Sequence, residues 1–127
     1  MAPAPARPRL YIDIETFSRT DVKKGVYRYA ADPDFDILMA AWSLDGGETH
    51  LALGAEEVTA IPHLRDPDVL KVAHNAQFER VCFSRFFDLP VGQYLPPEEW
   101  EDTMALAAEH GYPQSLDALA KALGAEE

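Results

Sequence analysis

Two acidic side chains, Asp13 and Glu15, are separated by one residue in a short alternating segment near the start of the chain. Successive side chains of a strand point to opposite faces, so both carboxylates share one face, about 6.8 Å apart at a rise of about 3.4 Å per residue. Two such carboxylates repel each other, and a divalent cation would relieve the repulsion. Mg²⁺ and Mn²⁺ prefer oxygen ligands of this kind. The alternative is that both acids simply face solvent on an edge strand.

A second set of polar residues runs from His74 to Arg80, where an apolar segment gives way to a helical pattern. Asn75 is predicted to be the N-cap of that helix. Glu79 falls in its first turn, where an acid suits the helix dipole. By helical angle, however, Glu79 borders the apolar face marked by Phe78 and Cys82, so it could point inward over the sheet edge. Farther on, Asp102 in Trp100–Met104 is interpreted as a helix N-cap.

The hydrophobic pattern predicts the strands that would position these groups. Alternation predicts a half-buried strand over residues 9–15, and apolar runs predict buried strands over 36–44 and 69–73. Asp45-Gly46-Gly47 predicts a hairpin turn leading into a strand over 48–53. Residues 16–35 are expected to form a loop with a short helix over 26–31, and another short helix is expected within 54–64.

Helices follow in the second half. Apolar residues at helical spacing predict a helix after Asn75, and residues 89–99 are expected to be a loop. Residues 97–110 suit a helix, either continuous or restarted at Asp102-Thr103. Ser115 is predicted to cap a last helix that stops at Gly124. The hairpin and the strand–helix order together predict an α/β fold, a mixed sheet with helices against it.

Composition bounds the function. The chain has 127 residues and a net charge of −11, which fits one domain. Its single cysteine, Cys82, excludes a disulfide framework and a thiolate zinc site. No apolar run reaches a membrane span, residues 1–8 are expected to be a disordered leader, and the expected location is the cytoplasm. Residues 1–30 carry six basic and three acidic groups. Residues 31–127 carry five basic and nineteen acidic groups. This acidic body argues against broad phosphate binding.

Four segments taken together resemble a known family. They are Asp13-Ile14-Glu15-Thr16, His74-Asn75-Ala76-Gln77-Phe78-Glu79, Asp102-Thr103-Met104 and Ser115-Leu116-Asp117-Ala118-Leu119-Ala120. The pattern is similar to the proofreading 3′–5′ exonuclease domain of the DEDD superfamily, in the form found in phage-type family A DNA polymerases. The resemblance runs from about Arg9 to the end of the chain, so residues 9–127 are interpreted as one partial exonuclease domain.

The resemblance implies an RNase H-like fold and phosphodiester hydrolysis by two Mg²⁺ or Mn²⁺ ions, releasing nucleoside monophosphates from the 3′ end of single-stranded DNA. Asp13 would bridge both ions, Glu15 would hold the ion that activates water, and Glu79 would serve the second ion. Asn75 and Phe78 match positions that seat the terminal nucleotide, and Thr16 matches one beside it. By position alone, an aromatic and four basic residues could guide the strand: Phe17, Arg19, Lys23, Lys24 and Arg28.

The chain departs from the family pattern at two places. Glu79 stands where the family usually has Asp. The family's fourth acid, in a Tyr-x-x-x-Asp or His-x-x-x-x-Asp helix, has no match: Tyr112 and Asp117 are one residue too far apart, and His110 meets no acid. The C-terminal part of the domain is therefore expected to be missing, with the missing segment or a polymerase domain as partner, and activity alone is expected to be weak or absent.

Two other readings stay open. A module of the same fold could bind nucleic acid or a protein partner without catalysis. A complete small nuclease could instead use Asp102 or Asp117 as its fourth acid.

Overall fold

The computed structural model describes residues 7–124 of the chain. Its centre is a five-stranded sheet in the order β3-β2-β1-β4-β5. The neighbouring pairs β1–β2 and β2–β3 are antiparallel, whereas β1–β4 and β4–β5 are parallel. The strands are β1 (Arg9–Phe17), β2 (Asp36–Leu44), β3 (His50–Leu53), β4 (Leu70–Ala73) and β5 (Trp100–Asp102). The predicted mixed α/β sheet is confirmed, and its strand order and directions are consistent with an RNase H-like fold.

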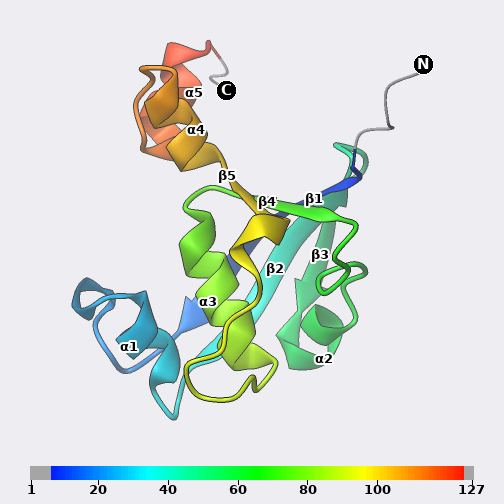
Figure 1. The fold of residues 1–127 in the computed structure, drawn as a ribbon, viewed down its shortest axis with the longest axis vertical. Coiled ribbons are helices and arrows are strands. Elements are labelled where there is room, and N and C mark those ends of the chain that lie inside the picture. The colour runs from blue at the N-terminus through cyan, green and yellow to red at the C-terminus, as the bar shows by residue number, and fades with distance from the viewer. Residues whose placement is uncertain (1–6, 125–127) are drawn as a thin grey trace.

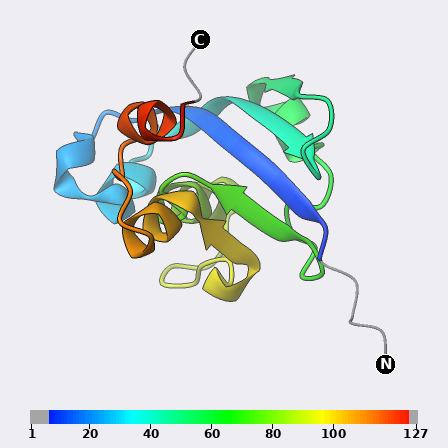
Figure 2. The ribbon, with the colours of Figure 1, turned by 90° about the horizontal axis from the view of Figure 1, so that it is seen from above.

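Five helices surround this sheet. Figure 1 shows α3 lying across the sheet with α1 beside it, α2 next to β3, and α4 and α5 together at the other end of the molecule. Figure 2, seen from above, shows α4 in orange and α5 in red as separate helices joined by a loop. They are α1 (Val26–Ala31), α2 (Gly54–Thr59), α3 (Ala76–Phe86), α4 (Thr103–Glu109) and α5 (Leu116–Ala122), with 3-10 turns at Val22–Lys24 and Pro97–Glu99. No helix in the described residues is long and apolar enough to cross a membrane.

The alternation of β1 divides the sheet into two faces. Leu10, Ile12 and Ile14 are buried, and the residues between them are exposed. The buried face packs against α3, whose Cys82 and Phe83 are fully buried in the same core. Burying this apolar surface is the main stabilising contribution to the fold. It also fixes the register, since a slip of one residue would turn the exposed acids of β1 into the core.

The hairpin between β2 and β3 forms as its sequence predicts. Asp45 and Gly46 have φ values of 53° and 73°, the left-handed pair that a tight turn joining two twisted strands requires. The Asp45 side chain also accepts a 2.8 Å bond from the Arg9 backbone N–H, which ties the turn to the start of β1. The strand after the turn begins at His50 rather than at residue 48.

A continuous helix over residues 97–110 is wrong, whereas the predicted alternative, a helix that starts at Asp102-Thr103, is confirmed. Residues 97–99 form a 3-10 turn and Trp100–Asp102 form β5, so the helix begins only at Thr103. Pairing with β4 decides this, because Lys71, Val72 and Ala73 lie opposite Trp100, Glu101 and Asp102. A three-residue strand is too short to show the alternation by which a strand is recognised in a sequence.

A β-bulge interrupts the β1–β2 pairing between Glu15 and Thr16. Glu15 lies opposite Met39, whereas Thr16 lies opposite Ile37, so Leu38 has no direct partner on β1 and its side chain is 48% exposed. Bulges bend a strand and re-aim the side chains next to them. The extra residue lies on β2, so β2 is the strand that bends beside Glu15 and Thr16.

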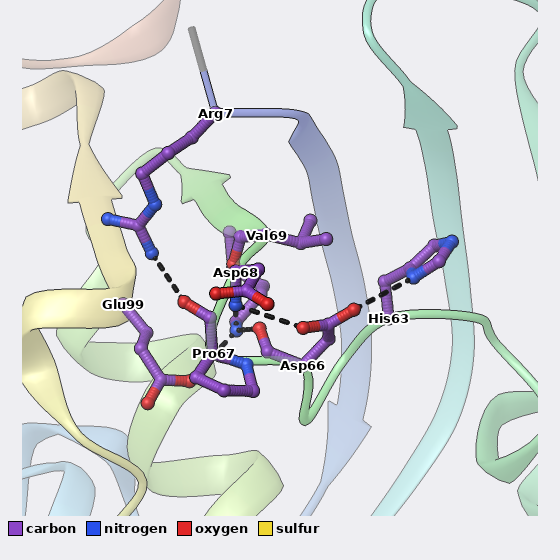
Figure 3. A network of polar contacts seen from close by, with 8 residues as sticks. Arg7, His63, Asp66, Pro67, Asp68, Val69 and Glu99 are labelled. Atoms are coloured by element: carbon purple, nitrogen blue, oxygen red, sulfur yellow. Dashed lines mark hydrogen bonds and ion pairs between the residues drawn. The ribbon is translucent and has the colours of Figure 1, made fainter. Parts of the chain in front are cut away.

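A buried lysine holds the sheet together at the start of β4. The Lys71 ammonium donates to the carbonyls of Asp66 and Val69 at 2.8 and 3.0 Å and to Glu99 Oε1 at 3.1 Å. Figure 3 shows the 66–69 loop between His63, Arg7 and Glu99. The Asp68 N–H donates to Asp66 and lowers the pKa of that carboxyl. Three acceptors satisfy the buried charge, as a buried ammonium requires.

The predicted disordered leader, residues 1–8, lies mostly outside the described residues. Its last two residues are described, and both bond to the region around β4. The Arg7 guanidinium donates to the Pro67 carbonyl at 2.8 Å, and the Pro8 carbonyl accepts from the Leu70 N–H at 2.9 Å.

Candidate functional site

Asp13 and Glu15 lie on the exposed face of β1, opposite Ala41 and Met39 of β2. The prediction that the two carboxylates share one strand face is confirmed. Beside Asp13 a cavity of about 260 Å³ opens on the sheet, lined in part by Tyr11, Trp42, His74 and Thr103. One predicted acid therefore borders a hollow into which residues of β2 and the β4–α3 turn also project.

Glu79 is buried in the first turn of α3, with only 4% of its surface exposed. The prediction that it turns inward is confirmed, and its Oε2 has no hydrogen-bond partner among the described residues. Burial, and then the charges of Asp13 and Asp102, raise the pKa of Glu79 from 4.5 to about 8, against an opposing effect of its own backbone N–H. An unpartnered buried carboxylate is costly unless it binds a proton or a cation.

Asp102 ends β5 and caps α4, as its sequence position indicates. Its Oδ1 accepts from the Met104 N–H at 2.9 Å and also from the Asn75 N–H at 2.8 Å. The second bond reaches across from β5 to the turn between β4 and α3. No sequence signal predicts it, because the two residues lie 27 positions apart.

Asn75 stands at the N-cap position of α3, as predicted, but it does not cap the helix with its side chain. Its backbone is left-handed, with φ 63° and ψ 58°, and its side chain makes no capping bond. A capping side chain requires an extended backbone at that residue. Asparagine is among the few residues that tolerate the left-handed conformation, so the residue type suits this turn for a different reason.

His74 joins the same turn to the C-terminal helices. Its Nδ1 lies 2.9 Å from the Thr103 hydroxyl, and its Nε2 bonds to the Gln114 carbonyl. Because a carbonyl can only accept, Nε2 carries a proton. His74 therefore connects the β4–α3 turn to both the start of α4 and the loop before α5.

Two of the three residues expected to seat a terminal nucleotide, Thr16 and Phe78, contact Tyr29 of α1. The Thr16 and Tyr29 hydroxyls are 2.8 Å apart. The Phe78 ring packs on Tyr29, with centroids 5.8 Å apart, and Asn75 is exposed at the start of α3. Thr16 and Phe78 are thus held in place by the fold, whereas the Asn75 side chain points to open surface.

The residues predicted to guide the DNA strand are all exposed, but one of them, Arg19, is already engaged in an ion pair. Arg19 pairs with Asp34 at 2.8 Å. Lys23 and Lys24 lie in the 3-10 turn after β1, and Arg28 lies on α1. The Phe17 ring at the end of β1 is 47% exposed. An exposed aromatic ring with cations nearby is the usual means of holding single-stranded nucleic acid.

The structure does not gather the acids into a finished metal centre. Within residues 7–124, no group of three or more His, Cys, Asp or Glu side chains lies close enough to hold a metal ion. Asp13 and Asp102 are nevertheless near enough to act on Glu79 through their charges. The donor set is entirely carboxylate, which suits Mg²⁺ or Mn²⁺.

The fold and the site together define an RNase H-like α/β unit. Its acidic side chains lie toward the carboxyl ends of the parallel strands β1, β4 and β5. No protein-family model matches the chain. The chain is similar to the DNA polymerase of Bacillus phage SP02, with 42% identity over 120 residues. That match covers 90% of this chain but only 18% of the polymerase.

Proposed function

We propose that the chain is part of a metal-dependent 3′–5′ exonuclease domain, of the proofreading kind, that belongs to a phage-type DNA polymerase. Its reaction would be hydrolysis of the last phosphodiester bond of a single-stranded DNA 3′ end, with release of a nucleoside monophosphate. The observation that carries this proposal is Glu79: a buried carboxylate with an unpartnered oxygen, close enough to Asp13 of β1 to feel its charge. The similarity to a phage DNA polymerase supports it.

Three carboxylates would hold the metal ions, namely Asp13, Glu15 and Glu79. Bound divalent ions would activate a water and stabilise the leaving oxygen. Asp13 and Glu15 would contribute ligands from the exposed face of β1, and Glu79 would contribute one from the buried first turn of α3.

The DNA strand would approach from the side of β1 and α1. Lys23, Lys24 and Arg28 supply exposed positive charge there, and Phe17 supplies a ring for stacking. Thr16 and Phe78 would seat the terminal nucleotide beside them. This basic region is small against an acidic body, so binding would be confined to one site.

A fourth acid is still required. Asp117 lies on α5, is exposed, and pairs with Lys121 at 3.4 Å. Asp102 lies near Glu79, but its Oδ1 is engaged by two backbone N–H groups. Neither residue completes the Tyr-x-x-x-Asp or His-x-x-x-x-Asp pattern of the family's fourth acid. We therefore propose that another segment, or the polymerase domain, completes the site, and that this chain alone has weak activity.

The test is degradation of a 5′-labelled single-stranded DNA by the 127-residue chain with Mn²⁺, together with Mn²⁺ binding. We expect slow shortening from the 3′ end that a chelator and Asp13→Ala both abolish. Asp68→Ala removes another exposed acid, in the loop before the start of β4, and is the matched control. A folded chain that neither shortens DNA nor binds Mn²⁺ in an Asp13-dependent way would contradict the proposal.

A non-catalytic nucleic-acid-binding module is the second candidate. The exposed Phe17 and the basic residues on α1 and the preceding turn favour it, because they need no metal. Affinity for single-stranded DNA that is unchanged by chelator and by Asp13→Ala, with no shortening, would distinguish it from the exonuclease.

A further inference from the structure

Asp102 joins two turns that leave the same edge of the sheet. It is the last residue of β5 and lies beside Ala73, the last residue of β4, in the parallel pairing. From these strand ends the chain turns into α3 on one side and α4 on the other. The Asp102 carboxylate bonds to a backbone N–H in each turn. We infer that Asp102 is a positioning residue that fixes the start of α3, and through it the Glu79 carboxylate. This inference rests on the proposed function.

The left-handed backbone of Asn75 is the element that Asp102 holds. A non-glycine residue at φ 63° is disfavoured unless its surroundings impose the conformation. The Asn75 side chain makes no capping bond. The 2.8 Å bond from its N–H to Asp102 Oδ1 fills that role from outside the helix. A charged acceptor makes such a bond stronger than a neutral one.

The neighbouring residue reinforces this contact. Thr103 Oγ1 lies 2.9 Å from His74 Nδ1 and 3.4 Å from the Ala73 carbonyl oxygen. Because the His74 proton is on Nε2, the single hydroxyl proton of Thr103 is donated to Nδ1. Asp102 and Thr103 thus hold Asn75 and His74, respectively. The β4–α3 turn is therefore fixed along its whole length by residues that come from the end of β5.

Glu79 lies one helical turn beyond Asn75. The Asn75 carbonyl accepts from the Phe78 N–H at 2.9 Å and so begins the first turn of α3. A rotation at Asn75 would turn the start of α3 about its axis and move Glu79 along the sheet edge. Glu79 needs a fixed direction, because it is buried and its Oε2 can be satisfied only by what reaches it from β1 or from solvent.

Three substitutions separate position from charge. Asp102→Asn keeps an oxygen acceptor at the same place and removes the charge, and Asp102→Glu keeps the charge and moves the acceptor by one methylene. Asp102→Ala removes both. The first readout is amide hydrogen exchange at Asn75 by NMR, which requires no activity. The second is Mn²⁺ affinity, together with Mn²⁺-dependent DNA shortening by the 127-residue chain.

We expect Asp102→Asn to retain the slow exchange at Asn75 and most of the Mn²⁺ affinity. Asp102→Glu and Asp102→Ala should lose that protection and weaken Mn²⁺ binding and shortening by roughly tenfold to a hundredfold, as loss of a group that orients a metal ligand does. If Asp102→Asn loses Mn²⁺ affinity while exchange at Asn75 stays slow, Asp102 acts through its charge and the inference is overturned.

Unchanged exchange at Asn75 in Asp102→Glu and Asp102→Ala would also overturn it. If Asp102→Ala does not fold, the comparison of Asp102→Asn with Asp102→Glu still shows whether Asp102 acts through the position of its acceptor oxygen or through its charge. If the parent neither binds Mn²⁺ nor shortens DNA, the proposed function fails, and the exchange data then show by themselves whether Asp102 positions the turn.

Discussion

Replacing Glu79 with glutamine should remove the pH dependence that this one carboxyl imposes on stability. Burial and the charges of Asp13 and Asp102 raise the pKa of Glu79 from 4.5 to about 8. The folded state thus binds this proton more tightly than the unfolded state does. The stabilisation is complete below about pH 4.5 and is lost as the pH rises through 8. At about 1.36 kcal/mol per pH unit, the span corresponds to about 5 kcal/mol.

Glutamine has the shape of protonated glutamate and does not titrate. We therefore expect Glu79→Gln to match the parent within about 1 kcal/mol near pH 5, the scale of one neutral hydrogen bond. Near pH 9 it should be more stable than the parent by several kcal/mol. The assay is urea unfolding at a series of pH values in the presence of a chelator, so that no cation neutralises the carboxylate.

The control is Glu98→Gln, which makes the same chemical change on an exposed side chain. The quantity to compare is the difference in unfolding free energy between each variant and the parent, because other groups titrate in all three proteins. If the Glu79→Gln difference stays constant from pH 5 to pH 9, Glu79 is not the buried proton-binding group described above.

Three further substitutions test other contacts. Asp13→Asn should lower the pKa of Glu79, since the Asp13 charge is one cause of its rise; an unchanged carboxyl NMR titration would contradict this. Lys71→Met should cost about 3 kcal/mol in urea unfolding, because Glu99 and two carbonyls lose a buried partner; a loss below about 1 kcal/mol, as for an exposed pair, would be too small. Tyr29→Phe removes the hydroxyl that bonds to Thr16 and should cost about 1 kcal/mol in thermal unfolding; no change would mean that the bond is not formed in solution.

The sequence was most informative where one local pattern decides the structure. Alternation placed Leu10, Ile12 and Ile14 in the core and the acids of β1 outside it, and Asp45-Gly46 fixed the hairpin. The inward direction of Glu79 followed from its helical angle alone. In each case the physical cause lies within a few residues of the pattern.

The sequence was least informative where distant residues decide. The strand at Trp100–Asp102 exists because β4 offers an open edge, and no three-residue pattern could indicate that. The left-handed Asn75 is held by a carboxylate 27 positions away. The buried charge of Lys71 likewise depends on Glu99, 28 positions farther along the chain. These contacts are long-range, so residue type and spacing carry no trace of them.

The contacts of Lys71 with Asp66, Val69 and Glu99 make the two ends of β4 differ in stability. Where the strand begins, three acceptors surround one buried cation; where it ends, the chain leads to an unpartnered buried carboxylate. The Lys71 contacts at the first end stabilise the folded state. The mutual repulsion of the acids at the second end lowers its stability. Natural proteins commonly exchange stability for function in this way. Variation among the acids can therefore alter reactivity while the opposite end of the strand keeps the sheet assembled.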